Sequence, residues 1–165
     1  YDFIIVGGGT AGSVLAARLS ETSSWNILVI EAGMNNVIVN HFPAITTKYQ
    51  GSRMDWHYET EPQQNCCNGL KDKKLYWPAG KVLGGTSEIN YMVYTRGNKD
   101  DYDLWASQGN PGWSYDEVLP YFLKSEKYRF SKFNYKYHNK GGVMSIEIPY
   151  TTNVTDAFLN GANEL

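Results

Sequence analysis

The sequence predicts an α/β fold that begins with a strand–helix–strand unit. Three observations lead to this prediction: the apolar run Phe3–Val6, the glycine-rich turn at 7–12 that leads into the apolar stretch Ser13–Leu19, and a second apolar run at 27–30. Short apolar runs bounded by turn residues are typical of strands in parallel sheets, and parallel strands need a crossover that is usually a helix. We therefore expect a βαβ unit over residues 1–33.

The turn between the first strand and the helix carries Gly7, Gly9 and Gly12 at G-x-G-x-x-G spacing. In a dinucleotide-binding βαβ unit the first glycine permits the tight turn, the second lets the backbone approach a pyrophosphate, and the third lets the helix pack close to the sheet. The unpaired N–H groups at the start of a helix carry partial positive charge and bind phosphate oxygens without a basic side chain. The spacing therefore predicts a dinucleotide pyrophosphate at this turn.

Glu31 follows the second apolar run, about twenty residues after Gly12, where a carboxylate can accept both hydroxyls of an adenosine ribose. A G-x-G-x-x-G spacing alone also occurs in glycine turns of ordinary βαβ units. Here the motif has a predicted strand before it and a predicted helix after it, and Glu31 stands at the expected distance. This context favours a dinucleotide whose ribose has a free 2′-hydroxyl.

The composition is that of a globular protein with one ordinary domain. The chain has 165 residues, 42% of them hydrophobic and 19% charged, and no apolar run near the roughly twenty residues that span a bilayer. The formal net charge of −2, without a basic cluster, argues against a nucleic-acid partner. Cys66 and Cys67 are adjacent, so we expect no disulfide within the chain. The N-x-[ST] triplet at Asn153 is a hint of secretion and leaves the compartment open.

Residues 34–76 break the alternation of helix and strand. Prolines, glycines and polar residues interrupt this stretch, so we expect an insertion rather than a second βαβ unit. Within it we expect a short helix at 44–49, an extended segment at 55–60, and an exposed loop or tight hairpin at 63–74.

A second glycine block follows the insertion. Gly84 and Gly85 allow the backbone to lie flat against another group. Thr86 or Ser87 is placed to cap a short helix. Asn90 offers an amide that donates and accepts at once, as the polar edge of a flavin or a phosphate would require.

Four further elements are expected: a helix over 98–106, a helix after residue 114, a strand at 143–148 that ends before Pro149, and a final helix over 153–165. Asn98 caps the first helix, and Ser114 with Glu117 forms a capping-box pattern for the second. Pro120 sits late for a first helical turn, so we expect that turn to be separate. The polar, aromatic stretch Tyr128–Lys140 shows neither helical nor strand period and is predicted to be a long surface loop.

With both glycine blocks in view, the chain resembles the N-terminal part of the glucose-methanol-choline (GMC) oxidoreductases, nearest to the insect glucose dehydrogenase-like members. The resemblance covers nearly the whole chain, and it rests above all on Gly80–Asp103, which fits the family's first signature position by position. It implies an α/β fold with a Rossmann-like FAD-binding βαβ core and loop-rich insertions, incomplete at the C-terminal end. The expected parts are the βαβ unit at 1–33, the insertion at 34–76, the second glycine block with its following helix at 77–105, and the start of the remaining domain at 106–165.

The resemblance also implies a cofactor and its contacts. FAD is implied rather than NAD, because the family's first motif holds the FAD pyrophosphate and its second lies along the cofactor near the flavin. Carried over residue by residue, the contacts are Gly7, Gly9, Thr10, Ala11 and Gly12 for the pyrophosphate, Glu31 for the adenosine ribose, Val82, Gly84 and Gly85 beside the cofactor, and Asn90, Tyr91, Met92 and Val93 on the ribityl–flavin side. Binding is expected to be non-covalent, since Ile89 stands where some relatives attach FAD through a histidine.

The reaction that the resemblance implies is removal of hydride from an alcohol or sugar carbon, with oxygen or another acceptor taking the electrons from FAD. The family's catalytic histidine belongs to a later part of the chain, so no catalytic residue is expected here. His41, His57 and His138 occupy none of the family's base positions. No metal site is expected either, because the acids at 100–103 lack nitrogen or sulfur ligands at suitable spacing and are typical of a solvated helix face.

The sequence departs from the family pattern at two positions. Ala79 stands where the family often has arginine, which puts one polar contact of the cofactor loop in doubt. Leu75 stands where a cysteine commonly precedes Tyr-Trp-Pro in the insect branch, so the usual loop disulfide cannot form.

Two alternatives to the FAD oxidoreductase are weighed. A nicotinamide-dependent dehydrogenase would use the same fingerprint but does not require the second glycine block. The second alternative is a truncated homologue that binds FAD or a partner but does not catalyse a reaction. The substrate, the electron acceptor and the oligomeric state are left open, and the resemblance with the Asn153 triplet favours an extracellular location.

Overall fold

The computed structural model describes residues 1–35, 43–148 and 151–164, and it divides into two compact units, Tyr1–Val93 and Tyr94–Leu165. Three expectations fall on residues outside the described ranges: His41, the strand-ending Pro149 and the last helical residue, Leu165. Among the residues that the structure does describe, no helix has the length and apolar character needed to cross a membrane.

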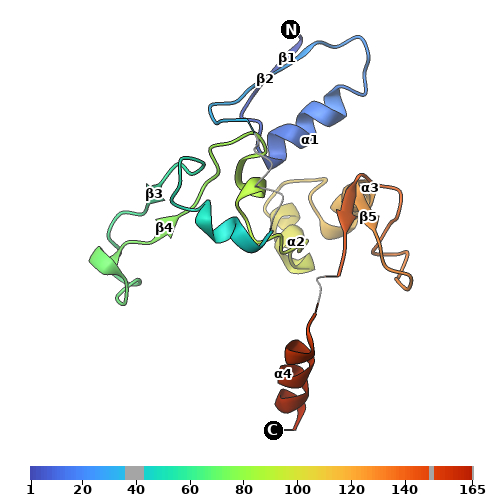
Figure 1. Cartoon of the computed structure of the whole chain (residues 1–165). Helices are drawn as coiled ribbons and strands as arrows, with labels where there is room; N and C mark the ends of the chain where they lie inside the picture. Colours follow the sequence, from blue (N-terminus) through green and yellow to red (C-terminus); the bar gives the residue numbers. More distant parts are fainter. Residues whose placement is uncertain (36–42, 149–150, 165) are drawn as a thin grey trace. The chain divides into compact units, whose positions relative to one another are not determined.

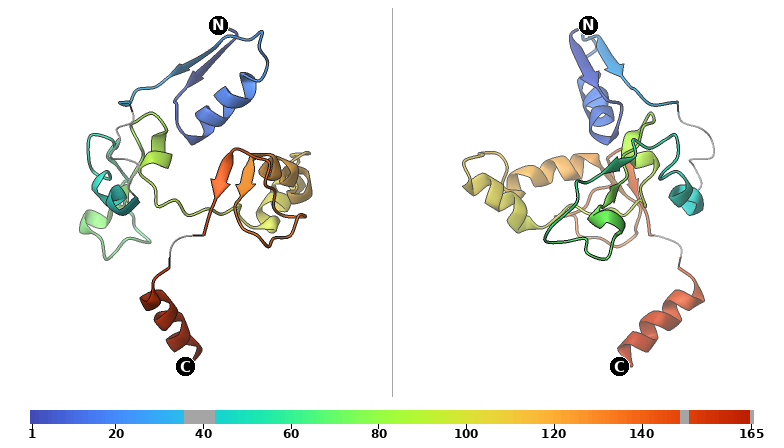
Figure 2. Two further views of the ribbon diagram at one scale, coloured as in Figure 1. Left: turned by 45° about the vertical axis from the view of Figure 1, so that its right-hand side comes forward. Right: turned by 90° about the vertical axis from the view of Figure 1, so that its left-hand side faces the viewer.

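The first unit begins with the strand–helix–strand arrangement that the sequence predicts. β1 (Phe3–Val6) pairs in parallel with β2 (Ile27–Ile30). The crossover between them is α1 (Thr10–Leu19), which lies along the strand pair (Figure 1; Figure 2). Ile5 is the buried residue of β1. The carboxyl ends of both strands therefore meet at one edge, next to the start of α1.

In its described residues, 34–35 and 43–76, the insertion contains short elements rather than a second βαβ unit. The predicted short helix is a 3₁₀-helix, η2 (Pro43–Lys48). The extended segment ends in β3 (Tyr58–Glu59), which pairs antiparallel with β4 (Tyr76–Trp77). The predicted loop connects these two strands and holds one 3₁₀ turn, η3 (Lys71–Lys73). The expected exposed loop is thus the connection of a hairpin.

A buried carboxylate ties the insertion to the second glycine block. Asp55 is 2% exposed and accepts hydrogen bonds from the Tyr76 hydroxyl at 2.5 Å and from the backbone N–H groups of Gly51 at 3.0 Å, His57 at 3.1 Å and Ala79 at 3.1 Å. Burial is the largest single effect on the pKa of Asp55 and raises it, but the four donors together outweigh burial and lower the pKa from 3.8 to about 2. A shift of this size stabilises the fold by roughly 2 kcal/mol near neutral pH.

The hydrophobic core of the first unit lies around the second glycine block. Met54, Val82 and Ile89 are buried, at 4%, 0% and 0% exposure, and Met34 and Tyr49 pack against them. Because Val82 precedes the glycines and Ile89 follows them, burial of these two side chains holds the block at both ends.

The expected cap by Thr86 or Ser87 is wrong. The short helix η4 (Gly85–Glu88) starts before both residues, and Gly84 precedes it without a side-chain cap. The hydroxyls have other partners instead: Thr86 Oγ1 accepts from the Gly80 N–H at 3.1 Å, and Ser87 Oγ donates to the Gly84 carbonyl at 2.6 Å. The residue before the helix is Gly84, whose φ of +100° lies in the left-handed region that favours glycine over Thr or Ser.

The second unit contains the three helices that the sequence predicts: α2 (Lys99–Ser107), α3 (Tyr115–Ser125) and α4 (Asn153–Asn163). Asn98 Oδ1 accepts from the Asp100 N–H at 3.1 Å, which confirms the predicted cap of α2. The predicted capping box of Ser114 and Glu117 is present at the start of α3.

The expectation that Pro120 separates the first turn of α3 is wrong, because α3 runs unbroken through this residue. A proline inside a helix removes one backbone hydrogen bond. Two features oppose this loss: the capping box at Ser114 holds the first turn, and Leu119 is buried beside the proline.

The predicted loop at 128–140 is wrong at its start, where Tyr128 belongs to a strand. β5 (Glu126–Tyr128) pairs in parallel with β6 (Met144–Ile146). Glu126 is wholly buried, and its carboxylate lies 2.6 Å from a guanidinium nitrogen of Arg96. A charged residue can enter a strand at this position because a cation from a distant part of the chain compensates its burial.

We predict that Tyr76→Phe lowers the free energy of unfolding by roughly 1–2 kcal/mol near neutral pH, because the substitution removes a hydrogen bond to a charged acceptor. The lowered pKa gives the sign of the pH dependence: the stabilisation by Asp55 is complete above the ordinary value of 3.8 and is lost as the pH falls towards 2. Urea unfolding near neutral pH and again at acidic pH measures the difference between the two proteins, which should shrink in acid.

The matched control is Tyr58→Phe, a tyrosine of the paired strand that is 50% exposed. An equal loss of stability in this control, or a loss in Tyr76→Phe that is independent of pH, would contradict the assigned role of Asp55.

Candidate functional site

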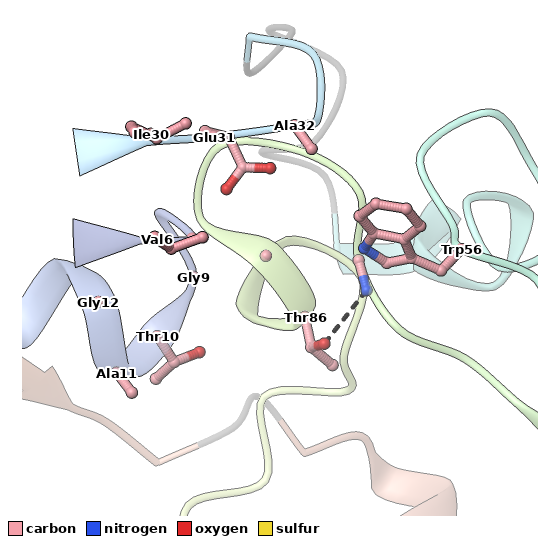
Figure 3. Close-up of a pocket in the computed structure, with 13 residues that line it drawn as sticks. Val6, Gly9, Thr10, Ala11, Gly12, Ile30, Glu31, Ala32, Trp56 and Thr86 are labelled. Atoms are coloured by element: carbon pink, nitrogen blue, oxygen red, sulfur yellow. Dashed lines mark hydrogen bonds between the residues drawn. The ribbon is translucent and has the colours of Figure 1, made fainter. Parts of the chain in front are cut away.

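A cavity of about 610 Å³ opens in the first unit, where the two glycine blocks face each other (Figure 3). It is lined by Val6, Gly7, Gly9, Thr10, Ala11, Gly12, Ile30, Glu31, Ala32, Trp56, Gly80, Gly85 and Thr86. The carboxyl ends of β1 and β2 both reach it. This edge is where parallel α/β sheets bind their ligands.

The two glycine blocks contact each other through their main chains. The Gly84 N–H donates to the Gly8 carbonyl at 2.8 Å. Gly85 has a φ of +59°, and a Cβ atom on it would lie 2.8 Å from the Gly9 Cα. A side chain at position 85 would therefore strain the backbone and push the blocks apart, so glycine is required there.

The start of α1 presents backbone N–H groups at the cavity wall. A Cβ atom on Gly12 would lie 2.0 Å from the Gly7 carbonyl oxygen, so only glycine lets the helix begin this close to the end of β1. No side chain caps the helix, and its first turn carries no acidic residue. The partial positive charge of the helix start is therefore available to an anion in the cavity.

Glu31 places a carboxylate beside this helix start. Its Oε2 atom accepts from the Gly8 N–H at 2.8 Å, and its Oε1 atom accepts from the Gly33 N–H at 2.6 Å. Each oxygen retains a further lone pair, because a carboxylate offers about four acceptor positions. The carboxylate is thus held by the backbone on both sides while it can still accept from hydroxyl groups in the cavity.

Trp56 forms the aromatic part of the wall (Figure 3). Its backbone N–H donates to the Ala79 carbonyl at 2.9 Å, and its ring stacks on Tyr58 with centroids 6.0 Å apart. The Lys81 ammonium lies 4.5 Å from the indole centroid, a cation–π contact. Sequence reasoning did not select Trp56 as a site residue, although the Asp55-Trp56 pair lies within the extended segment that it identified.

The cavity brings together seven of the predicted cofactor contacts: Gly7, Gly9, Thr10, Ala11, Gly12, Glu31 and Gly85. Val82 and Gly84 adjoin the cavity wall without lining the cavity. Val82 packs in the core, and the Gly84 N–H donates to the Gly8 carbonyl. The other lining residues, which sequence reasoning missed, are Val6, Ile30, Ala32, Trp56, Gly80 and Thr86. Apart from Trp56, each of these residues lies within a few positions of a glycine block or of Glu31 in the sequence.

The remaining predicted contacts, Asn90, Tyr91, Met92 and Val93, do not line the cavity in the described part of the chain. They form an exposed segment after η4, in which Asn90 Oδ1 accepts from the Met92 N–H at 2.9 Å. The amide of Asn90 therefore stabilises its own turn in this structure.

The two described histidines take part in structural contacts. The backbone N–H of His57 donates to Asp55. In the second unit, His138 Nδ1 lies 3.1 Å from the buried Glu126 carboxylate, and the His138 ring stacks on Tyr128 at 4.1 Å. Neither histidine is among the lining residues.

The acids at 100–103 belong to α2. Asp103 pairs with Lys99 at 2.6 Å and accepts from the Tyr115 N–H at 3.0 Å. The hydrogen bond from Lys99, with that from Tyr115, lowers the pKa of Asp103. Over the described ranges, no group of three histidine, cysteine or acidic side chains is arranged to hold a metal ion.

Comparison with known proteins identifies close relatives of the whole chain. The family model of the GMC oxidoreductases matches residues 1–165. Glucose dehydrogenase (FAD, quinone) from Drosophila pseudoobscura pseudoobscura is 47% identical over 100% of the chain and 27% of its own length. Pyranose dehydrogenase from Agaricus xanthodermus is 43% identical over 100% of the chain and 29% of its own length.

A solved structure supports the same relationship. The crystal structure of pyridoxine 4-oxidase from Mesorbium loti matches with a TM-score of 0.86 and 36% identity, over 99% of the chain and 32% of that protein. The chain thus spans about a third or less of the length of these relatives. It belongs to the GMC oxidoreductase family and corresponds to its N-terminal part.

Proposed function

We propose that this chain binds FAD in the cavity between its glycine blocks, as part of a protein that oxidises CH–OH groups of alcohols or sugars. One observation carries the proposal: a single cavity combines an uncapped helix start, a main-chain contact between two glycine blocks, and a carboxylate held at the end of β2. The name of the Drosophila relative includes FAD, which supports FAD over NAD. The second glycine block supports the same choice, because a nicotinamide site does not need it.

The residues present fit a flavin dinucleotide. A Cβ atom on Gly12 would clash with the Gly7 carbonyl and one on Gly85 with the Gly9 backbone, so glycine at both positions lets the backbone segments of the cavity wall lie close together. The first-turn N–H groups of α1 would hold the pyrophosphate, and Glu31 would accept the ribose hydroxyls. Bound FAD would supply the acceptor for hydride, and the protein would position it and exclude water.

The proposal also includes cofactor contacts from the segment that follows η4, outside the cavity. Asn90, Tyr91, Met92 and Val93 are proposed to meet the ribityl–flavin side of the cofactor. Their exposure supports this, because an exposed segment is accessible to a ligand that extends past the cavity wall. Ile89 is wholly buried and has no nucleophilic atom, which supports non-covalent binding.

The substrate and the catalytic base are proposed to involve the parts of the relatives that this chain does not span. The glucose and pyranose dehydrogenases point to a sugar or another alcohol as substrate. An extracellular location remains a prediction, supported by the Asn153 triplet at the exposed start of α4.

We predict that Glu31→Gln weakens FAD binding by roughly ten- to a hundredfold, because a charge-assisted hydrogen bond to the ribose is lost. Titration of the apoprotein, in the longest product that contains this chain, with FAD monitored by flavin fluorescence gives the dissociation constant. Glu61→Gln is the matched control, an exposed acid of the same unit outside the cavity wall. Equal affinity of Glu31→Gln and the unsubstituted protein would refute the ribose contact.

We predict that acid precipitation of the FAD-loaded protein releases all of its flavin into the supernatant, because position 89 offers no nucleophile for attachment. Absorbance of the supernatant and mass spectrometry of the peptide that contains Ile89 check this, with a covalent flavoprotein as the positive control. Flavin mass on that peptide would overturn the prediction.

We predict that the 165-residue chain by itself, supplied with FAD, has no dye-linked turnover on a panel of sugars and short alcohols. Loss of a general base alone costs roughly a hundred- to ten-thousandfold in rate. The chain should also sediment as an aggregate, because within the described residues β1 and β2 pair only with each other, and they expose Val6 and Ile30. Turnover by a monodisperse chain that is abolished by His57→Gln or His138→Gln would contradict the assignment of the base to another part of the protein.

A further inference from the structure

The connection between β3 and β4 holds two free thiols side by side. Cys66 and Cys67 are adjacent in the sequence, and their Sγ atoms lie 3.5 Å apart. Adjacent residues in extended backbone point their side chains in opposite directions. Here Cys67 has a φ of +61°, a conformation that is uncommon for residues other than glycine, and the two sulfurs come together.

Solvent reaches this pair, and the turn that carries it is held by backbone bonds. Cys66 is exposed, and Cys67 is half-buried. The Leu70 N–H donates to the Cys67 carbonyl at 3.0 Å, and the Gln63 N–H donates to the Lys73 carbonyl at 3.0 Å. The chain contains two cysteines in all, so each thiol has the other as its one possible cysteine partner within the chain.

We propose that Cys66 and Cys67 form a vicinal dithiol site that reacts with low-molecular-weight disulfides and closes reversibly into a ring disulfide. The proposal rests on the arrangement of these two side chains and is independent of FAD binding. It revises the expectation of no disulfide within the chain, which rested on the adjacency of the two cysteines and did not include the 3.5 Å separation of their sulfurs in this structure.

The reaction proceeds in two exchanges. The Cys66 thiolate attacks one sulfur of the small disulfide, expels one thiol and forms a mixed disulfide; the Cys67 thiolate then attacks the Cys66 sulfur and expels the second thiol. Two protein S–H bonds and the S–S bond of the oxidant break, and one protein S–S bond forms. The two electrons and two protons leave with the two released thiols.

The order of the two exchanges follows from exposure and ionisation. Cys66 is the more accessible thiol. The hydrogen bond with Cys66, together with burial, raises the pKa of Cys67, which favours Cys66 as the first nucleophile.

The ring is strained, which makes it reversible. Neighbouring Cα atoms across a trans peptide are about 3.8 Å apart, whereas disulfides usually join Cα atoms about 4.4–6.8 Å apart. Strained, exposed disulfides have more oxidising potentials and are readily reduced. The site is therefore suited to respond to the thiol–disulfide balance of its surroundings rather than to brace the loop permanently.

The test is oxidation of the longest product that contains this chain by excess oxidised glutathione, followed by acid quench, tryptic digestion and mass measurement of peptide 54–71, which contains both cysteines. In the unsubstituted protein this peptide should be lighter by two hydrogen atoms, linked internally and without an adduct. In Cys66→Ser and in Cys67→Ser the peptide should retain one glutathione, since neither variant has a neighbouring thiol to displace it.

The same reaction in concentrated urea tests whether the folded turn, and not only the adjacency of the two cysteines in the sequence, promotes ring closure. Ring closure should be faster in the native chain than in urea, because the native turn already brings the sulfurs together. Two stable glutathione adducts on the unsubstituted chain, a disulfide-linked dimer, or closure that is as fast in urea as in buffer would each overturn the proposal.

Discussion

The candidate site depends on one constraint, the direct main-chain contact between two glycine blocks that lie far apart in the sequence. At Gly9 and Gly85 no side chain separates the two backbones, and the Gly84 N–H bonds the Gly8 carbonyl next to this contact. Residues of both blocks next to this contact line the cavity. Burial of Val82 in the core holds the second block in place.

Acidic side chains organise the irregular parts of both units. Loops leave backbone N–H groups without the partners that helices and sheets provide, and these groups need acceptors when they are removed from water. Glu31 bonds two such groups, and Asp55 bonds three together with a hydroxyl. Glu126 accepts from the Asn139 N–H in the same way, beside Arg96. These three acidic side chains therefore stabilise particular loop conformations.

Sequence reasoning succeeded for several local signals, although the local predictions of a cap at Thr86 or Ser87 and of a break at Pro120 were wrong. It also failed where a distant partner decides the outcome. The strand–helix–strand unit and the caps at Asn98 and Ser114 follow from patterns a few residues long, and the structure confirms them. The strand at Glu126 has no such pattern, because its charged residue is buried only through Arg96. Trp56 reaches the cavity through the backbone bonds around Asp55, which no periodicity predicts.

The contact between the glycine blocks also orders events during synthesis. A nascent chain that has emerged as far as residue 33 holds the whole fingerprint, yet four of the thirteen residues that line the cavity, Trp56, Gly80, Gly85 and Thr86, have not emerged. Contacts between distant segments form late, because the intervening loop must close first. Until the segment around Gly85 emerges, the start of α1 and the edge of β1 face water or a chaperone. The pocket is thus complete only after the second glycine block has emerged and docked, and the long insertion between the two blocks sets the minimum delay.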